Sequence, residues 1–308
     1  MSGPELTGAL SGLVPLAIGD LPRFKAAVEA ARHEGWSWYL PHLLSRNREG
    51  RRSVLIGEDG GSLCVYFWRG GTAPARLDLY LPPVPLDIAA LDRALARADE
   101  HNGDHSAEVL RVGENDAATL THHARLRLVP RRVEYLYDPA AFADLGGGRY
   151  RTLRRHTALV EALSGVEVRP YEPGDAAACL SLLERWREGH RAAHGNAGGA
   201  GASRRVLALA GRLLPVDLLG EVVLVDGRLT AFAFGGEIRP GLACFLEAKS
   251  DGTPGMSHFH RRSFLLRLRG FELVNDGSDL GRPGLRQLKE SLRPVRTHAE
   301  FRATRRPR

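Results

Sequence analysis

Polar and charged side chains gather near the end of this chain in an order that suits a site for a polar acyl donor. Residues 271–301 are predicted to form a strand, a polar loop, a basic helix that begins at Pro283, and a final strand. The loop contains an amide, a hydroxyl and two carboxylates, namely Asn275, Asp276, Ser278 and Asp279. Carboxylates that face guanidinium and ammonium groups where two elements meet can bind phosphates and handle a proton.

The helix after this loop carries cationic residues at helical spacing. Arg286, Lys289 and Arg293 recur at i, i+3 and i+7, which predicts one shared face beside an apolar stripe of leucines. Such a face borders the buried side of the helix and could reach into a cleft. We expect Arg286 to bind a phosphate or carboxylate through its planar guanidinium. A solvent-exposed basic face is the alternative interpretation.

A second candidate acid, Glu247, stands in the middle of a mostly apolar stretch, residues 242–249, that alternates as a strand. The alternation predicts that Phe245, Glu247 and Lys249 face one way. A carboxylate there is costly if it is buried without a partner, so Glu247 could bind an α-ammonium group or accept a proton. A surface pair of Glu247 with Lys249 is the alternative, and for Asp279 the alternative is a capping or turn role.

A further group of cations lies near the middle of the chain. Arg151, Arg154 and Arg155 fall in residues 146–163, which we expect to form a basic linker helix. Together with Arg293 they are candidates for contact with an RNA backbone. The formal net charge of +7 agrees with a polyanionic partner such as RNA, a phosphorylated cofactor or an acidic membrane surface, although a basic solvated surface is the alternative. We expect no DNA partner.

Other features exclude several classes of protein. The three cysteines, Cys64, Cys179 and Cys244, are scattered, which predicts neither a disulfide framework nor a structural zinc site and indicates a cytoplasmic setting. Paired histidines such as His258 and His260 lack a third ligand at useful spacing, so we predict no metal site. No apolar run approaches the roughly 20 residues of a spanning helix, and no signal peptide is recognisable, so we expect a soluble protein.

The elements that must position these residues repeat in order along the 308 residues. Each half is predicted to run β-α-α-β-β-β-α-β-α-β, with one hairpin in each half. We therefore expect an α/β fold with mixed sheets, in which domains at residues 1–145 and 164–308 are joined by the linker helix. The glycine-rich stretch 195–201 is predicted to be a plain loop or a mobile lid.

Several stretches resemble the phosphatidylglycerol lysyltransferase C-terminal domain family, which has two tandem GNAT acyltransferase domains and uses aminoacyl-tRNA. The resemblance covers most of the chain from about Trp36 onward and is carried by residues 134–137, 145–156, 245–249 and 275–294. Its lipid-modifying members carry a membrane domain ahead of this module, so we expect a soluble stand-alone member. The family's Glu-Lys-acidic run appears here as Glu247-Ala248-Lys249, with the lysine displaced.

The resemblance implies transfer of an aminoacyl group from charged tRNA to an amine or hydroxyl of a small molecule or lipid headgroup, without a cofactor. In GNAT-like folds the fourth and fifth strands splay apart around the acyl group. The resemblance implies one set of catalytic residues, Glu247, Asp279 and Lys289. It also implies a set of substrate contacts, Asn275, Lys249, Arg286 and Ser291.

Two other functions stay open. One is an acyl-CoA-dependent N-acyltransferase, although residues 250–256 lack the Arg/Gln-x-x-Gly-x-Gly/Ala turn that coenzyme A requires. The other is a non-catalytic, regulatory protein that binds RNA. The sequence does not identify the amino acid that is transferred or its acceptor.

Overall fold

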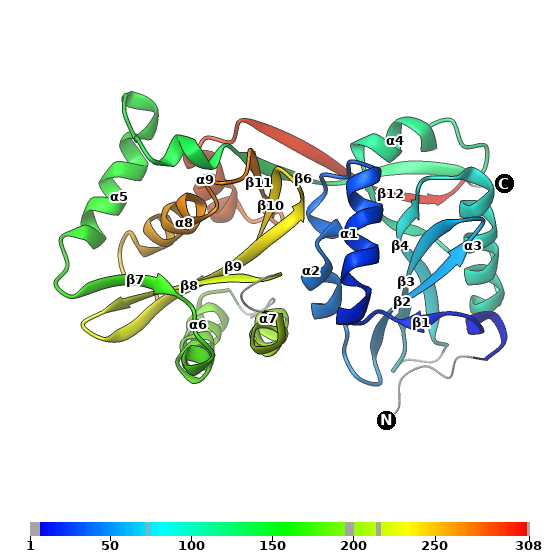
Figure 1. Cartoon of the computed structure of the whole chain (residues 1–308), viewed down its shortest axis with the longest axis horizontal. Coiled ribbons are helices and arrows are strands. Elements are labelled where there is room, and N and C mark those ends of the chain that lie inside the picture. Colours follow the sequence, from blue (N-terminus) through cyan, green and yellow to red (C-terminus); the bar gives the residue numbers. More distant parts are fainter. Residues whose placement is uncertain (1–6, 72–73, 195–199, 214–216, 307–308) are drawn as a thin grey trace. The chain divides into compact units, whose positions relative to one another are not determined.

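The chain folds into two compact units, each a β-sheet with helices packed against it (Figure 1). The structure is a computed structural model that describes residues 7–71, 74–194, 200–213 and 217–306. The first unit comprises Met1–Glu134 with His298–Arg308, and the second comprises Tyr135–Thr297. Residues 195–199 of the glycine-rich stretch lie outside the described residues, so the prediction of a loop or lid stays a prediction.

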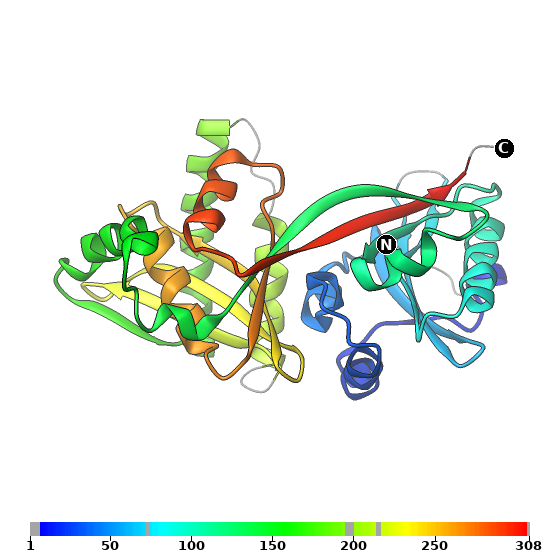
Figure 2. The same cartoon turned by 90° about the horizontal axis from the view of Figure 1, so that it is seen from above.

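The first unit has the strand order β1-β2-β3-β4-β5-β12-β6. Its strands are β1 (Val14–Pro15), β2 (Arg52–Asp59), β3 (Ser62–Arg69), β4 (Arg76–Val84), β5 (Val109–Gly113), β12 (Arg296–Arg305) and the first part of β6 (Leu126–Tyr137). Its helices are α1 (Leu21–Ala30), α2 (Leu40–Ser45), α3 (Ile88–Asn102) and α4 (Glu114–Leu120). Thus the last strand of the chain belongs to the first unit, where it lies beside β6 (Figure 2) and pairs antiparallel with β5.

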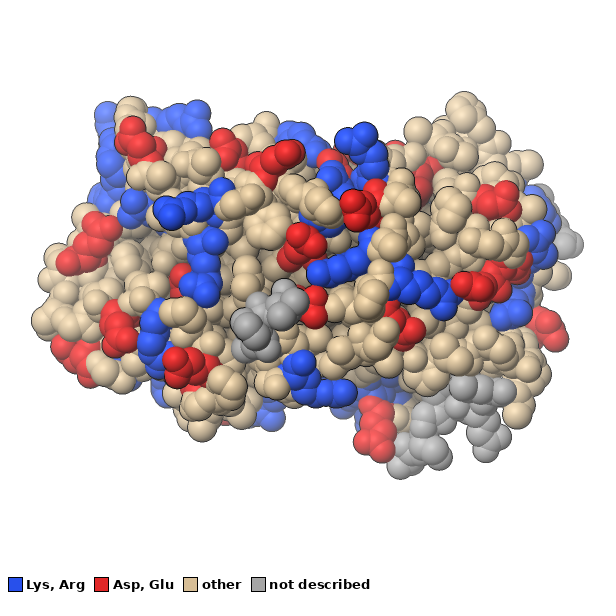
Figure 3. All heavy atoms as spheres, in the orientation of Figure 1, with Lys and Arg blue, Asp and Glu red and all other residues tan. Residues whose placement is uncertain are grey.

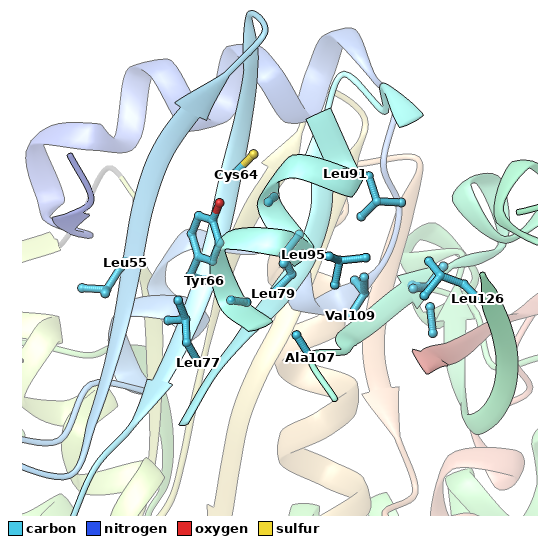
Figure 4. Close-up of a cluster of buried hydrophobic side chains, with 14 of the residues drawn as sticks. Leu55, Cys64, Tyr66, Leu77, Leu79, Leu91, Leu95, Ala107, Val109 and Leu126 are labelled. Carbon is cyan, nitrogen blue, oxygen red and sulfur yellow. The ribbon is translucent and has the colours of Figure 1, made fainter. Parts of the chain in front are cut away.

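The core of the first unit lies between this sheet and α3 (Figure 4). Asp87 caps α3 by accepting a hydrogen bond from the amide of Ala90 at 2.6 Å, and the helix ends at Gly103, whose φ of +70° favours glycine. Leu91 and Leu95 of α3 are fully buried against residues of the sheet. The helical spacing of these leucines therefore fixes the face of α3 that packs on the sheet.

The second unit has the strand order β6-β11-β10-β9-β8-β7. Its further strands are β7 (Val166–Pro170), β8 (Leu219–Val225), β9 (Arg228–Arg239), β10 (Leu242–Ser250) and β11 (Leu273–Ser278). Its helices are α5 (Arg151–Glu161), α6 (Ala176–His194), α7 (Ala200–Leu213), α8 (Met256–Arg267) and α9 (Pro283–Ser291). The helices α5 and α8 pack on each other on one side of the sheet, and α6 and α7 lie on the other side (Figure 1).

Strands β10 and β11 pair only at their beginnings within the described residues. Their parallel register runs from Leu242 opposite Leu273 to Cys244 opposite Asn275, whereas β10 continues against β9 as far as Ser250. The separation agrees with the splayed fourth and fifth strands that the resemblance implies. It places Glu247 and Lys249 on β10 beyond the last residue pair with β11.

A β-bulge in β10 changes which residues share a face. Phe245 pairs with Gly235 but Glu247 pairs with Phe234, so one extra residue of β10 stands opposite β9. Phe245 packs on Phe264 of α8. After the bulge, the side chains of β10 alternate between the two faces of the sheet in the opposite order. The prediction that Phe245 faces the same way as Glu247 and Lys249 is therefore wrong.

The predicted α/β class with mixed sheets agrees with this architecture. The domain bounds 1–145, 146–163 and 164–308 stay a prediction, and the compact units differ from them in two respects. The C-terminal strand is grouped with the first half, because β12 pairs with β5. The predicted linker helix is present as α5, and it packs on α8 within the second unit.

Candidate functional site

The carboxylate of Asp279, just after β11, is fixed by three hydrogen bonds. Its Oδ2 accepts hydrogen bonds from Nε of Arg286 at 2.6 Å and from the hydroxyl of Tyr135 at 3.0 Å. Its Oδ1 accepts the amide of Gly281 at 2.8 Å. Burial raises the pKa of Asp279, but the hydrogen bonds from Arg286, Gly281 and Tyr135 outweigh it and leave the pKa below its usual value. Asp279 is therefore an ionised acceptor at neutral pH. It has a turn role through the amide of Gly281, and it also pairs with Arg286.

Lys289 lies in the core, where its ammonium is used within the fold. Only 2% of the residue is exposed. Its Nζ donates to the carbonyl oxygens of Asp276 and Gly277 and lies 2.9 Å from Oδ2 of Asp276. The same Asp276 oxygen accepts a hydrogen bond from Arg261 of α8 at 2.6 Å. Because buried charges are costly when unpaired, these partners hold the end of β11 against α8 and α9.

The predicted basic face of α9 is not formed as expected. Lys289 is buried while the Arg286 side chain is 57% exposed, so the two point into different environments. Arg293 lies beyond the end of α9 at Ser291 and has a φ of +59°. The prediction of one face shared by Arg286, Lys289 and Arg293 is therefore wrong, because the helix ends before its third member.

Glu247 and Lys249 form an ion pair on the side of β10 that faces α6. The Nζ of Lys249 contacts Oε1 of Glu247 and lies 4.8 Å from the ring centre of Trp186 on α6. The two charged side chains are only 15% and 10% exposed, so this pair is not the solvated surface pair of the alternative interpretation. The pair lies on β10 beyond the last residue pair with β11.

Two further predicted substrate contacts serve the local fold. The Oδ1 of Asn275 accepts the amide of Gly277 at 2.8 Å, which shapes the end of β11. The hydroxyl of Ser291 donates to the carbonyl of Leu288 at 2.6 Å and lies 3.2 Å from Nε2 of His258. Since the hydroxyl hydrogen is used by Leu288, the His258 ring donates to Ser291. This arrangement is not that of a serine nucleophile with a histidine base.

His258 and His260 of α8 are held neutral. His258 stacks on His156 of α5 with ring centres 4.2 Å apart, and burial, then His156 and Arg261, lower its pKa to about 4. Burial lowers the pKa of His260 to about 3, helped by the charges of Arg261 and Lys249. Among the described residues, no group of three or more His, Cys, Asp or Glu side chains could hold a metal ion.

The candidate RNA contacts differ in their availability. Arg154 donates to the carbonyl oxygens of Leu145 and Gly147, and Nε of Arg293 donates to the carbonyl of Arg149 at 2.9 Å. Arg151 and Arg155 of α5 are exposed. An RNA role for these residues stays a prediction, as do the catalytic and substrate-binding roles of the residues above.

The structure adds three residues that sequence reasoning did not place in the site. The hydroxyl of Tyr135 donates to Asp279, which is 144 residues away, so no local pattern indicates this contact. The guanidinium carbon of Arg261 lies 4.9 Å from the ring centre of Phe245. No feature of the sequence indicates that Arg261, and not its neighbour Arg262, makes this contact. Trp186 fits the apolar face of its helix, and its contact with Lys249 depends on tertiary packing that no sequence pattern reports.

Comparison with known proteins agrees with the resemblance. Residues 48–304 match the family described as "Phosphatidylglycerol lysyltransferase, C-terminal". No curated protein sequence matches the chain significantly. Within the described residues, no helix combines the length and apolar character that crossing a membrane requires.

Solved structures show the same fold at low sequence identity. A conserved protein of unknown function from Bacteroides thetaiotaomicron is 20% identical, with a TM-score of 0.75 over 96% of this chain and 99% of that one. The C-terminal domain of a putative lysylphosphatidylglycerol synthetase from Agrobacterium fabrum is 19% identical, with a TM-score of 0.62 over 93% of each chain. A tandem GNAT protein from the clavulanic acid biosynthesis pathway is 14% identical, with a TM-score of 0.51 over 96% of this chain and 99% of that one.

These likenesses confirm the mixed α/β fold of tandem GNAT type, and the family match supports an acyltransferase. The chain belongs to the phosphatidylglycerol lysyltransferase C-terminal family.

Proposed function

We propose that the second unit transfers an aminoacyl group from a charged tRNA to an amine or hydroxyl acceptor. The observation that carries this proposal is the Asp279 carboxylate held between Arg286 and Tyr135, just after the strand that parts from β10. The family match covers this segment. The acceptor class, a small molecule or a lipid headgroup, belongs to the proposal, and the family's name supports the lipid headgroup.

The reaction needs positioning more than it needs a strong catalyst. An aminoacyl ester is already activated, so the protein must bring the acceptor to the ester carbonyl, remove its proton and stabilise the oxyanion. Glu247 is suited to bind the α-ammonium group or to take the proton, because its carboxylate is largely buried and forms an ion pair with Lys249. The exposed guanidinium of Arg286 is suited to bind a phosphate of the donor.

Lys289 and Asn275 act as positioning residues in this proposal. The buried ammonium of Lys289 holds the backbone of Asp276 and Gly277, and Asn275 shapes the same turn. Through this turn they fix the direction of the Asp279 carboxylate. A direct catalytic role for Lys289 would require its ammonium to leave three oxygen partners.

The start of α8 weighs against the coenzyme A alternative. The amides of Met256 and His258 donate to the nearby carbonyls of Thr253 and Gly255, so they are not free for a pyrophosphate. A Cβ atom at Gly255 would collide with the carbonyl oxygen of His156, which shows how closely α5 covers this turn. Coenzyme A dependence is therefore an outcome of the test and is not a second proposal.

The test combines mixed charged tRNAs with candidate acceptors and, separately, with acetyl-CoA. We expect acceptor-dependent deacylation of a charged tRNA, and a loss of at least about 100-fold in Glu247→Gln, Asp279→Asn and Arg286→Gln, as when groups used in the transition state are removed. Arg228→Gln is the matched control, because Arg228 also forms an exposed pair, with Asp251 at 2.9 Å. Turnover with acetyl-CoA alone, or RNA binding without turnover, would overturn the proposal.

A further inference from the structure

A dense cluster of arginines lies in the first unit, far along the sequence from the candidate site. Four arginines fall within residues 46–52, which run from the end of α2 to the first residue of β2, and we call this segment the arginine turn. Arg48, Arg51 and Arg52 are exposed, and Arg46 lies 5.6 Å from the ring centre of Phe67. The turn therefore presents several guanidinium groups to solvent on a short stretch of chain.

The arginine turn lacks carboxylate partners, which three other exposed arginines of this unit have. Arg23 pairs with Glu58, Arg93 with Asp59 and Arg125 with Asp92, at 2.5 to 2.6 Å. Over the face drawn in Figure 3, cationic and anionic side chains are likewise interspersed. Within the part of the chain that the structure describes, no ion pair is formed by the arginines of the turn.

Like charges crowd one another in and around the turn. Burial, and then the guanidinium groups of Arg46, Arg48 and Arg69, lower the pKa of Arg52. The nearby carboxylate of Asp78 cannot relieve this repulsion, because it is buried between Arg69 and Arg76. Glu49 offsets one of the four arginines, which leaves residues 46–52 with a formal charge of +3. Binding of a polyanion to such a surface is favourable, because it relieves the repulsion between like charges.

The backbone of the turn is held in a fixed shape. The amide of Arg48 donates to the carbonyl of Arg52 at 2.8 Å, and the amide of Arg52 donates back to Arg48 at 2.8 Å. The carbonyl of Arg51 accepts the amide of Gly70 at 2.9 Å, which ties the turn to β3. Gly50, with a φ of +63°, provides the left-handed residue that this geometry needs. A rigid turn loses little backbone entropy when a ligand binds.

We propose that the arginine turn is a contact surface for the phosphodiester backbone of RNA. Guanidinium forks fit phosphates in pairs of hydrogen bonds, and arginine is the preferred residue for this contact. A membrane surface fits less well, because a few basic residues alone are weakly attracted to anionic lipids, and stable peripheral binding adds apolar side chains that enter the bilayer. The neighbouring Phe67 and Trp68 are buried, and residues 46–52 contain no large apolar side chain. That the RNA is a tRNA rests on the proposed function.

The test measures the affinity of the full chain for fluorescently labelled, unfractionated tRNA at several salt concentrations. The variant Arg48→Gln/Arg51→Gln/Arg52→Gln removes three charges from the turn. The matched control Arg23→Gln/Arg93→Gln/Arg125→Gln removes the same charge from exposed, paired positions of the same unit. We expect the turn variant to lose about tenfold or more in affinity at moderate salt, with a salt slope smaller by about 2, and the control to change far less.

The inference is overturned if both triple variants lose tRNA affinity equally, if neither variant loses it, or if the parent chain does not bind tRNA. Flotation with vesicles of phosphatidylglycerol gives the membrane arm: loss of vesicle binding with unchanged tRNA affinity would also overturn it. Thermal unfolding checks that both variants are folded.

The failure of the inference can be told apart from the failure of the proposed function. If tRNA binding depends on the turn but no charged tRNA is deacylated, the proposed function fails and the inference stands. If transfer proceeds in the turn variant with an unchanged KM for charged tRNA, the inference fails and the function stands.

Discussion

At the scale of single residues, the candidate site depends on how one carboxylate is held. Asp279 receives donors from a neighbouring helix, its own turn and Tyr135, which is 144 residues away in the sequence. The arginine is exposed, whereas the tyrosine is 6% exposed. Tyr135 is therefore the partner that fixes the carboxylate from the protein side.

We predict that Tyr135→Phe lowers kcat/KM for aminoacyl transfer by about tenfold or more, because a hydrogen bond to a charged group contributes about 1.5–3 kcal/mol. Loss of this donor also raises the pKa of Asp279, so the acidic limb of the pH–rate profile should move to higher pH. Tyr150→Phe, which removes a hydroxyl bonded to Arg149, is the control. An unshifted pH profile with full activity in Tyr135→Phe would show that Asp279 does not depend on this bond.

At the scale of elements, local patterns predicted nearly every helix and strand, but they did not predict the partners of charged side chains. The spacing of seven residues from Asp279 to Arg286 is local, so the sequence could bring these two together. The burial of Lys289 depends on backbone carbonyl oxygens of β11, which no residue pattern reveals. The bulge between Phe245 and Glu247 is equally hidden, because an alternating strand looks the same with or without one extra residue.

The packing of α5 on α8 makes a prediction about acid stability. Because the pKa of His258 falls from 6.5 to about 4 on folding, the unfolded chain binds more protons between these values. The stabilisation from neutral His258 is complete above pH 6.5 and is lost as the pH falls towards 4. We expect His258→Gln to weaken this pH dependence by about 1–2 kcal/mol, allowing for partial exposure.

Urea unfolding at pH 7 and pH 5 measures the effect, and the m-value checks that the unfolding remains comparable between variants. His122→Gln is the control, because His122 is exposed. If both variants keep the full pH dependence of the parent chain, the stacked pair of His156 and His258 does not set acid stability.

At the scale of the whole molecule, the two compact units are not consecutive halves of the chain. Residues 135–297 are inserted between the two parts of the first unit, and β12 completes that unit beside β5. The repeated element order along the sequence could not show this, because a terminal strand has the same pattern whichever sheet it joins.

We predict that a chain ending at residue 297 keeps a folded second unit but has a destabilised first unit. The truncation removes Ala303 from the core and leaves β5 without its antiparallel partner. Hydrogen exchange should show loss of protection in β4 and β5 and retained protection in β9 and β10. Uniform protection of both units in the truncated chain would contradict this view of β12.

The pairing of β12 with β5 also sets the order in which the first unit can be completed during synthesis. Residues up to Glu134 of this unit are translated before the second unit, whereas its strand from His298 is translated after it. We therefore expect the sheet of the first unit to close only after residues 135–297 have been made. Until then, an incomplete first unit exposes the edge of β5 to proteases and chaperones.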